Sequence, residues 1–394
     1  MNILPTAAAG LRSGASKTRD AKVLVVDDIE ANRDILIRRL ARLGITDTIQ
    51  AVDGRAALDV IRSTAVDLVL LDIMMPVMTG FDVLEAMAAE GRTEQIPVIV
   101  ISAMDEMEAV VRAISLGAED FLLKPFDPIL LRARVLPTLE KKQLRDQMRA
   151  ELARKQAELA EARSLQLALT PPRYADARLM IDVVLEPARE VGGDLVDHVR
   201  LPDGRHLLVL GDVSDKGAGA ALVMARTHAL TRGFAARPDL LGDPARIADA
   251  LNHELAQGNE SCMFVTMLIG LFDPSHGRLD YVRCGHVPPF LRRADGSLER
   301  LGVSGGMPLG VSELGSYASA SISLSAGDSL LLLSDGVTEA AAPDGPLFND
   351  DQVEQWLAAP PDGLASLVAA VRAHEAGGPA SDDLAALLLT INSL

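Results

Sequence analysis

The sequence has 394 residues, of which 48% are hydrophobic and 24% are charged, and its formal net charge is −17 at pH 7. A chain of this length is too long for one ordinary hydrophobic core, so we expect two or three domains. The negative charge argues against binding to nucleic acid or to an anionic membrane surface, because both would repel the protein. No apolar run reaches the length of about 18 residues that a membrane-spanning helix needs.

The first residues and the two cysteines bear on where the protein works. Residues 1–20 contain Arg12, Lys17 and Arg19 and no apolar run of signal-peptide length, so we expect a flexible tail. Cys262 and Cys284 do not form a CxxC pair, which favours a reducing compartment over a disulfide scaffold. These features predict a cytoplasmic protein.

Residues 21–139 alternate short apolar runs with helical periodicity, a pattern typical of a doubly wound α/β domain with a parallel sheet. The apolar runs predict strands that are buried on both faces. These runs are Val23–Val26, Asp67–Leu71, Pro97–Ile101 and Asp120–Leu123. In such a domain, ligands bind at the carboxyl ends of the strands.

Polar side chains stand at the ends of these predicted strands, and together they suit a phosphoryl group. The carboxylates of Asp27, Asp28 and Asp72 would repel one another in one crevice unless a hard divalent cation such as Mg2+ neutralised them. The Ser102 hydroxyl and the Lys124 ammonium would suit the oxygens of a phosphoryl group carried on Asp72. Helix capping and solvation explain each residue singly, but not the whole set at successive strand ends. The set predicts an acyl-phosphate switch.

The segments that carry these residues resemble a response-regulator receiver domain. They are Val25–Asp28, Leu70–Gly80 and Leu123–Pro125. The resemblance covers roughly residues 22–139 and implies a five-stranded, flavodoxin-like fold. It also implies that Asp72 accepts a phosphoryl group from a histidine kinase or a small phosphodonor.

The receiver resemblance assigns further roles around Asp72. It implies that Asp28, Asp72 and the carbonyl of Met74 coordinate Mg2+, with help from Asp27, and that Ser102 and Lys124 bind the phosphoryl oxygens. Phe121 matches the aromatic switch position of the family, although packing alone would also place an aromatic residue on this strand. The peptide bond before Pro125 is expected to be cis.

Residues 140–170 have the composition of a helical linker, and helical character runs from Ile129 to Leu169 with Pro137 as the only internal breaker. A heptad-like stripe favours a coiled coil and a homodimer formed through this helix. The apolar members of the stripe are Met148, Leu152, Leu159 and Leu169, but Lys155, Ala162 and Gln166 fall on it too. A solvated spacer helix is the alternative.

The sequence pattern changes in residues 171–394, where segments with alternating apolar and polar residues are joined by turns that contain Gly, Pro and Asp. This pattern predicts an α+β domain with much antiparallel sheet. The expected strands are Leu179–Leu185, Arg205–Val213, Phe264–Phe272, Arg278–Val282, Pro288–Arg292, Ser319–Ser323, Ser329–Leu333 and Leu384–Leu389. No zinc-ligand spacing, nucleophile elbow or P-loop is present.

Aspartates recur at strand ends or in Gly-rich turns of this second domain. The four motifs are Gly192–Asp194, Gly211–Asp212, Ser334–Gly336 and Ser381–Asp383. Carboxylates without His or Cys favour Mg2+ or Mn2+ over zinc, and two such ions could bind a phosphate ester and activate a water. Scattered turn aspartates are the alternative explanation.

The second domain resembles the metal-dependent PP2C-like serine/threonine phosphatases, in the bacterial stress and sporulation branch that acts on anti-sigma-factor antagonists. The likeness spans residues 162–390. The segments that carry it are Ala162–Gln166, Leu169–Pro171, Val191–Asp194, Gly211–Gly217, Cys284–Pro289, Pro308–Gly310, Leu333–Ala340 and Ser381–Asp383. It implies an αββα sandwich with two Mn2+ or Mg2+ ions between the edges of its sheets.

By position in this resemblance, Asp212 bridges both metal ions. The Val213 carbonyl and Asp194, through a water, serve one ion, and Asp335 and Asp382 serve the other. Asp383 matches an accompanying polar position among the metal residues. Leu195 and Val196 replace the aromatic pair common after the Gly-Gly-Asp turn, and Val287 and Cys284 alter the Gly-His-Pro-Pro loop. These departures remove no carboxylate and bear on substrate fit.

Together, the two resemblances imply that phosphorylation of Asp72 controls a phosphatase. Its substrate would be a phosphoprotein, namely an anti-sigma-factor antagonist. A non-catalytic scaffold, in which the receiver gates protein binding by the second domain, is the alternative. A small phosphate metabolite as the substrate also stays open, because a metal site recognises phosphate rather than peptide.

Overall fold

The computed structural model describes residues 20–103, 107–125, 127–302, 306–343, 345–359, 361, 363–378 and 380–393. The chain divides into two compact units, and the division falls after Lys155. The tail expected over residues 1–20 lies outside the described residues, except for Asp20. Among the helices of these ranges, none combines the length and the apolar character that crossing a membrane requires.

The first unit contains the expected five-stranded parallel sheet, in the order β2-β1-β3-β4-β5. Its strands are β1 (Val23–Val26), β2 (Thr48–Ala51), β3 (Leu68–Asp72), β4 (Val98–Ala103) and β5 (Asp120–Lys124). The apolar runs did not reveal β2. This edge strand is only partly buried and carries Thr48 and Gln50, so it lacks the apolar run of a central strand.

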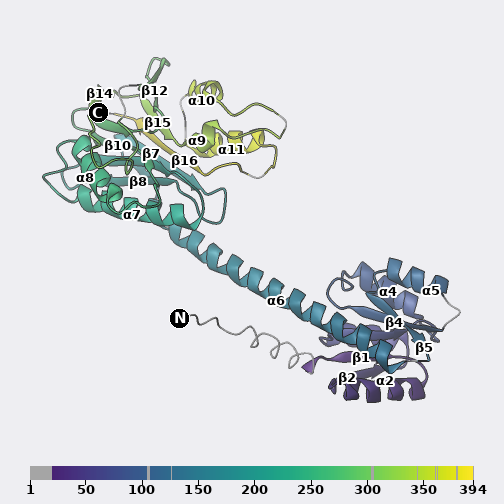
Figure 1. The fold of residues 1–394 in the computed structure, drawn as a ribbon. Coiled ribbons are helices and arrows are strands. Elements are labelled where there is room, and N and C mark those ends of the chain that lie inside the picture. The colour runs from purple at the N-terminus through teal and green to yellow at the C-terminus, as the bar shows by residue number, and fades with distance from the viewer. Residues whose placement is uncertain are drawn as a thin grey trace, which may run out of the picture. The chain divides into compact units, whose positions relative to one another are not determined.

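Helices cover both faces of this sheet, and Figure 1 shows α2 on the opposite side from α4 and α5. The helices are α2 (Glu30–Arg42), α3 (Gly54–Ser63), α4 (Gly80–Ala89) and α5 (Met107–Ser115). Strand β1 shows how one strand serves two cores. Leu24 and Val26 pack with α3 and α4, whereas Val23 and Val25 pack with α2, because successive side chains point to opposite faces.

One long helix, α6 (Pro128–Leu167), follows the sheet. The helix continues through Pro137, which was expected to interrupt it. Leu131, Val135 and Leu139 around this proline are buried against the receiver sheet. This packing accounts for a helix that tolerates the hydrogen bond lost at proline.

The second unit contains two antiparallel sheets, in the orders β14-β11-β10-β9-β8 and β13-β12-β15-β16-β7-β6. The first sheet contains β8 (Leu195–Arg200), β9 (His206–Val213), β10 (Val265–Asp273), β11 (Arg278–Cys284) and β14 (Ala320–Ser323). The second contains β6 (Tyr174–Ala175), β7 (Leu179–Glu186), β12 (Phe290–Arg292), β13 (Leu298–Arg300), β15 (Ser329–Leu333) and β16 (Leu384–Ile391).

The two sheets form the inner layers of an αββα sandwich, which confirms the expected fold. Leu208 and Leu210 of β9 lie in the core that also contains Leu330 and Leu332 of β15. The alternate residues of β9 face the helices on the outer side of their own sheet. The central strands β15 and β16 are almost entirely apolar because both of their faces are buried.

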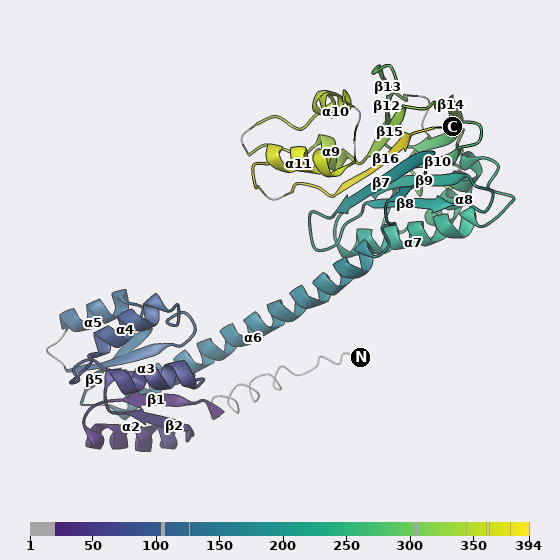
Figure 2. The ribbon, with the colours of Figure 1, turned by 180° about the vertical axis from the view of Figure 1, so that it is seen from behind.

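Helices form the two outer layers, and Figure 2 shows α7 and α8 on one side of the strands and α9, α10 and α11 on the other. The helices on the first sheet are α7 (Ala218–Ala235) and α8 (Pro244–Ala256). Those on the second are α9 (Asp335–Thr338), α10 (Asp350–Leu357) and α11 (Ala365–His374). The ends of the inner strands therefore remain the place where loops from both sheets can meet.

Candidate functional sites

The three acidic residues of the first unit meet at the carboxyl ends of two neighbouring strands. Asp72 is the last residue of β3, and Asp27 and Asp28 directly follow β1, which pairs with β3. One oxygen from each carboxylate lies within 4.8 Å of the others. Asp27 and Asp72 are buried, whereas Asp28 is exposed. The predicted acidic crevice is therefore present, with one member open to solvent.

Lys124, at the end of β5, supplies a positive charge to this crevice. Its Nζ lies 2.8 Å from Oδ2 of Asp72 and 3.1 Å from Oδ2 of Asp27. Burial raises the pKa of Asp72, and the hydrogen bond and charge of Lys124 oppose this effect. Burial lowers the pKa of Lys124, but bonds to Asp72 and Asp27 outweigh it, so that the pKa is raised. The Lys124–Pro125 peptide is cis, as expected.

The remaining receiver residues lie around the same strand ends. Ser102 is buried on β4, which pairs with β3 and β5. The backbone of Met74 hydrogen-bonds Asp72 and lowers its pKa, although burial and the charge of Asp27 keep the pKa raised overall. Phe121 is half-buried on β5, and the guanidinium of Arg134 lies 5.9 Å from the centre of its ring. The roles of these residues stay predictions.

Asn32, in the first turn of α2, belongs to the crevice although no motif in the sequence pointed to it. Its side-chain amide lies 3.0 and 3.1 Å from the two carboxylate oxygens of Asp27. The backbone N–H of Ile29 donates to the same carboxylate. These bonds orient Asp27 toward Asp72, and the clustered oxygens fit Mg2+, which prefers carboxylate ligands.

The second acidic site lies where loops from both sheets of the sandwich meet. Asp194 directly precedes β8 and Asp212 is the penultimate residue of β9, and these strands pair through Leu195 and Gly211. Asp335 begins α9 just after β15, and Asp382 precedes β16, which pairs with β15. Strand pairing within each sheet and the packing of the two sheets thus bring together residues up to 188 positions apart in the sequence, from Asp194 to Asp382.

Burial and mutual repulsion oppose ionisation at this second site. Burial raises the pKa of Asp212 to about 7, with a further contribution from the charge of Asp335 and an opposing hydrogen bond from Asp194. Burial raises the pKa of Asp194 well above its ordinary value, and the charge of Asp212 adds to this. Burial also raises the pKa of Asp335. Such a group of carboxylates is the environment that a divalent cation stabilises.

One atom of the second site lacks any partner. Oδ2 of Asp194 is buried and accepts no hydrogen bond from any residue that the structure describes. A buried carboxylate oxygen without a partner costs free energy, and cation ligation is one way in which proteins satisfy it. The carboxylate donors and this free oxygen fit Mg2+ or Mn2+. Within the described ranges, however, three carboxylates with oxygens within 4.8 Å of one another occur at Asp27, Asp28 and Asp72 and not here.

Lys216 takes part in this site, although the sequence analysis gave it no role. Its Nζ lies 2.9 Å from Oδ2 of Asp382 and 3.1 Å from the carbonyl oxygen of Ser381. The ammonium therefore neutralises the most exposed end of the acidic group. It lies in the turn between β9 and α7, in which Gly217 has a φ of 85° that other residues rarely adopt.

Asp383 and Val213 lie beside the same centre. Both oxygens of Asp383 accept backbone N–H groups, from Ala188 at 2.8 Å and from Gly193 at 2.7 Å. In this structure Asp383 therefore anchors the loop that leads to Asp194, and its role as a metal ligand stays a prediction. A side chain at Gly193 would come within 2.9 Å of the Val213 carbonyl oxygen, so glycine allows the two segments their close approach.

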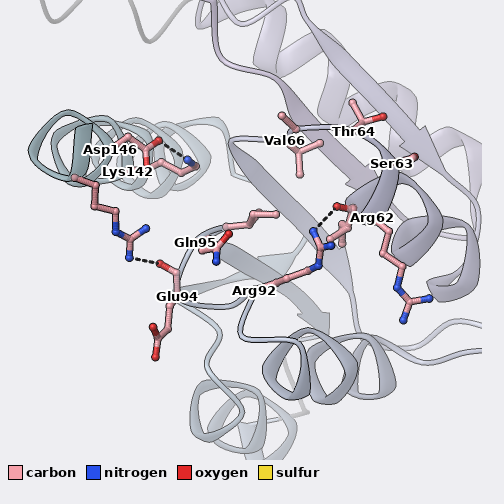
Figure 3. A pocket seen from close by; sticks show the side chains of 13 residues that line it. Arg62, Ser63, Thr64, Val66, Arg92, Glu94, Gln95, Lys142 and Asp146 are labelled. Atoms are coloured by element: carbon pink, nitrogen blue, oxygen red, sulfur yellow. Dashed lines mark hydrogen bonds and ion pairs between the residues drawn. The ribbon is translucent and has the colours of Figure 1, made fainter. Parts of the chain in front are cut away.

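A cavity of about 640 Å3 lies in the first unit (Figure 3). It is lined by the end of α3, the loop before β4 and part of α6. The cationic side chains around it already have partners: Arg62 and Arg92 bond to Glu90, and Lys142 bonds to Asp146. None of the predicted phosphoryl-site residues lines it, so its size alone does not make it the functional site.

Each of the two units contains a segment that matches a known protein family. Residues 23–136 match the family described as Response regulator receiver domain. Residues 202–392 match the family described as Stage II sporulation protein E (SpoIIE). The receiver strands with Asp72 fall inside the first matched range, and Asp212, Asp335 and Asp382 fall inside the second, while Asp194 and the strands β6, β7 and β8 precede it.

Relatives match parts of the chain. Protein IcfG from a Synechocystis species is 30% identical over 227 residues, which are 51% of this chain and 36% of that protein. The chemotaxis protein CheY from Pseudomonas aeruginosa is 33% identical over 120 residues, which are 30% of this chain and 97% of that protein. Response regulator PleD from Caulobacter vibrioides is 39% identical over 129 residues, which are 33% of this chain and 28% of that protein. The chain thus spans about a third of the length of IcfG and of PleD.

A solved structure supports the sandwich fold. The SiaA-PP2C domain of Pseudomonas aeruginosa aligns with a TM-score of 0.52 and 18% sequence identity, and the alignment covers 61% of this chain and 98% of that chain. At this identity the likeness concerns the fold alone. It agrees with the two antiparallel sheets between helical layers described above.

Proposed function

Because this chain belongs to the response regulators and carries a SpoIIE-type PP2C domain behind its receiver domain, we propose that it is a metal-dependent protein serine/threonine phosphatase controlled by phosphorylation of Asp72. The carboxylates of Asp194, which is buried, and of Asp212 and Asp335, which are partly buried, carry the first half of this proposal. Their raised pKa values and the unpartnered oxygen of Asp194 support a site built for divalent cations.

Each residue of the proposed phosphatase site has its own task. By the family resemblance, Asp212 would be shared between two cations, Asp194 and the Val213 carbonyl would serve one of them, and Asp335 and Asp382 would serve the other. Two Mn2+ or Mg2+ ions would supply an activated water and neutralise the charge of a phosphate ester. Lys216 would exchange its bond with Asp382 for solvent or for a phosphate oxygen when the cations bind.

The proposed substrate is a phosphoserine or phosphothreonine protein, and a small anti-sigma-factor antagonist is the specific candidate. This choice rests on the resemblance of the Gly-Gly-Asp, Asp-Gly and Ser-Asp-Asp motifs to phosphatases of that branch. Leu195 and Val196 are both buried here, so they shape the strand beneath the site rather than the surface that a substrate touches.

The proposed receiver activity is acceptance of a phosphoryl group on Asp72 from a histidine kinase or a small phosphodonor. Mg2+ would be held by Asp28, Asp72 and the Met74 carbonyl beside Asp27. The position of Lys124, 2.8 Å from Asp72, supports this role, because an ammonium at that distance can bind a phosphoryl oxygen. The exposed carboxylate of Asp28 leaves the crevice open to a donor.

Replacement of Asp212 tests the phosphatase proposal. The purified chain with Mn2+ should release phosphate from a phosphorylated antagonist protein, and Asp212→Asn should lower kcat by at least about 100-fold, because a shared metal ligand is lost. Asp295→Asn, in an exposed turn between β12 and β13, is the matched control and should keep the wild-type rate. Equal phosphate release by the wild type and Asp212→Asn would rule out this mechanism.

A further inference from the structure

The last turn of α6 contains one buried polar side chain. Gln166 is 5% exposed, whereas its described neighbours from residue 160 to residue 169 are exposed or only partly buried. Burial of an uncharged amide costs free energy unless its donor and its acceptor are both satisfied. A helix that is otherwise solvated therefore makes its buried contact through a group with strict hydrogen-bonding requirements.

The donor and the acceptor of the Gln166 amide are both satisfied by the backbone of one residue, Gly192. Its Nε2 donates to the carbonyl oxygen of Gly192 at 3.0 Å, and its Oε1 accepts from the backbone N–H of Gly192 at 3.0 Å. This pair of bonds, here called the Gln166 clamp, has the pattern by which one strand residue holds another. Arg163, one turn earlier on the same face, donates to the carbonyl of Arg189 at 2.9 Å.

The clamped segment, residues 187–193, lies between β7 and β8 outside both sheets. Its backbone groups lack ladder partners there, and side chains take their place. Asp383 holds the segment from the other side through the N–H groups of Ala188 and Gly193. A Cβ atom on Gly192 would clash with Oδ2 of Asp383. The loop is thus held tightly between α6 and Asp383.

Asp194 directly follows this clamped loop. Its side chain is 2% exposed and carries the oxygen that has no partner. The backbone position of Asp194 therefore depends on Gly192 and Gly193, which in turn depend on Gln166 and Asp383. A shift of Gly192 by the length of a broken hydrogen bond would move Asp194 relative to Asp212.

We propose that Gln166 is a positioning residue of the metal centre: by holding Gly192, its clamp fixes Asp194 in the geometry that binds the cation. This inference rests on the metal site of the proposed function. The clamp touches neither cation nor substrate, and it acts through the loop alone. Loss of the clamp weakens cation binding and leaves the sandwich core intact, since no residue of that core contacts Gln166 through these bonds.

Three variants of the full-length chain test this role. Gln166→Ala removes both bonds and the side-chain volume, and Gln166→Met keeps the volume but cannot form the bonds. Gln156→Ala removes a glutamine at an exposed position of the same helix and is the matched control. Titration calorimetry with Mn2+ and hydrogen exchange of the Gly192 amide without metal are measured for each, beside urea unfolding.

Both Gln166 variants should bind Mn2+ about tenfold more weakly than the wild type, the lower end of the range for residues that orient metal ligands. Exchange of the Gly192 amide should be faster in both, and the phosphatase rate should recover as Mn2+ is raised to saturation. Gln156→Ala should match the wild type in all three measurements.

Other outcomes overturn the inference. Wild-type Mn2+ affinity in Gln166→Met would show that side-chain volume, and not the clamp, matters. If both variants bound Mn2+ with the wild-type affinity and only their urea unfolding midpoint were lower, Gln166 would stabilise the fold without positioning the metal site. A wild-type chain that binds no Mn2+ at its second unit would overturn the proposed function, and the inference with it. If the inference alone fails, the wild type still binds Mn2+ and releases phosphate, and Asp212→Asn is still inactive.

Discussion

At the scale of single residues, burial shifts the pKa of several ionisable groups in the direction that favours their neutral forms. Asp194 and Asp212 are carboxylates whose pKa is raised by burial first and by their neighbours second. His198 and His206, on β8 and β9, are imidazoles whose pKa is lowered by burial. The acidic group has a proposed use in binding cations, while the histidine pair bears on the stability of the fold.

The histidine pair should make the second unit sensitive to acid. Nε2 of His198 lies 2.8 Å from Nδ1 of His206, and burial lowers the pKa of His198 to about 4. The folded chain keeps His198 neutral while the unfolded chain protonates it near pH 6.5. The free energy of unfolding should therefore fall as the pH falls from about 6.5 to about 4, by about 3 kcal/mol from this residue.

Urea unfolding of His198→Gln over this pH range checks the prediction. Glutamine keeps a hydrogen-bonding group but cannot titrate, so the variant should lose less stability than the wild type as the pH falls. His253→Gln, at an exposed position on α8, should retain the full pH dependence. A wild-type pH dependence in His198→Gln would contradict the assignment.

At the scale of elements, apolar patterning predicted the strands that are buried on both faces and missed shorter or more polar ones, among them β8, which contains charges. β9 and β15 were evident as apolar runs, whereas β8 includes Asp197 and His198 and was not predicted. Asp197 is buried because Arg232 of α7 bonds both of its oxygens, at 2.7 and 2.8 Å. The partner lies 35 positions away, so local periodicity could not reveal why a charge is tolerated in this strand.

The middle of α6 has an exposed apolar face that does not pack against the first unit. Leu144, Met148 and Leu152 follow one another at intervals of four residues and are 67%, 74% and 56% exposed. The expected seam does not continue to the end of the helix, since Gln166 is buried against its own unit. Dimerisation through residues around Met148 and Leu152 stays a prediction, because exposed apolar side chains at this spacing favour pairing with a second helix.

Light scattering can decide the oligomeric state. The wild-type chain should be a dimer, and Met148→Lys combined with Leu152→Lys should shift it to the monomer, because two charges would be buried in the seam. The double variant Ala150→Lys and Ala157→Lys places the same charges at exposed positions on the opposite face and should remain dimeric. A monomeric wild type would exclude this seam.

At the scale of the whole molecule, the architecture and the acidic residues were predictable, while the residues that support them were not. Asp72, Asp212 and Asp335 stand at strand ends, where sequence patterns point to them directly. Asn32, Lys216 and the clamp of Gln166 depend on which loops the fold brings together. A side chain that bonds the backbone of a distant segment leaves no local pattern, because its partner can be any residue type.

Control of the phosphatase by the receiver is the prediction that concerns the entire chain. Treatment with a small acyl phosphate should change the phosphatase rate of the wild type by at least about fivefold, the lower end of ordinary allosteric coupling. Asp72→Ala should show no change, because it lacks the acceptor carboxylate. Four equal rates, from both proteins with and without the acyl phosphate, would exclude the coupling.

The origin of the four carboxylates also bears on folding. Asp194 and Asp212 belong to one sheet of the sandwich, and Asp335 and Asp382 to the other. The two halves of the sandwich therefore meet at this edge with like charges facing each other, and the attraction of their apolar cores must overcome that repulsion. A cation shared between them would act as a removable cross-link, so that maturation of the fold and loading of the catalytic centre would be one thermodynamic event.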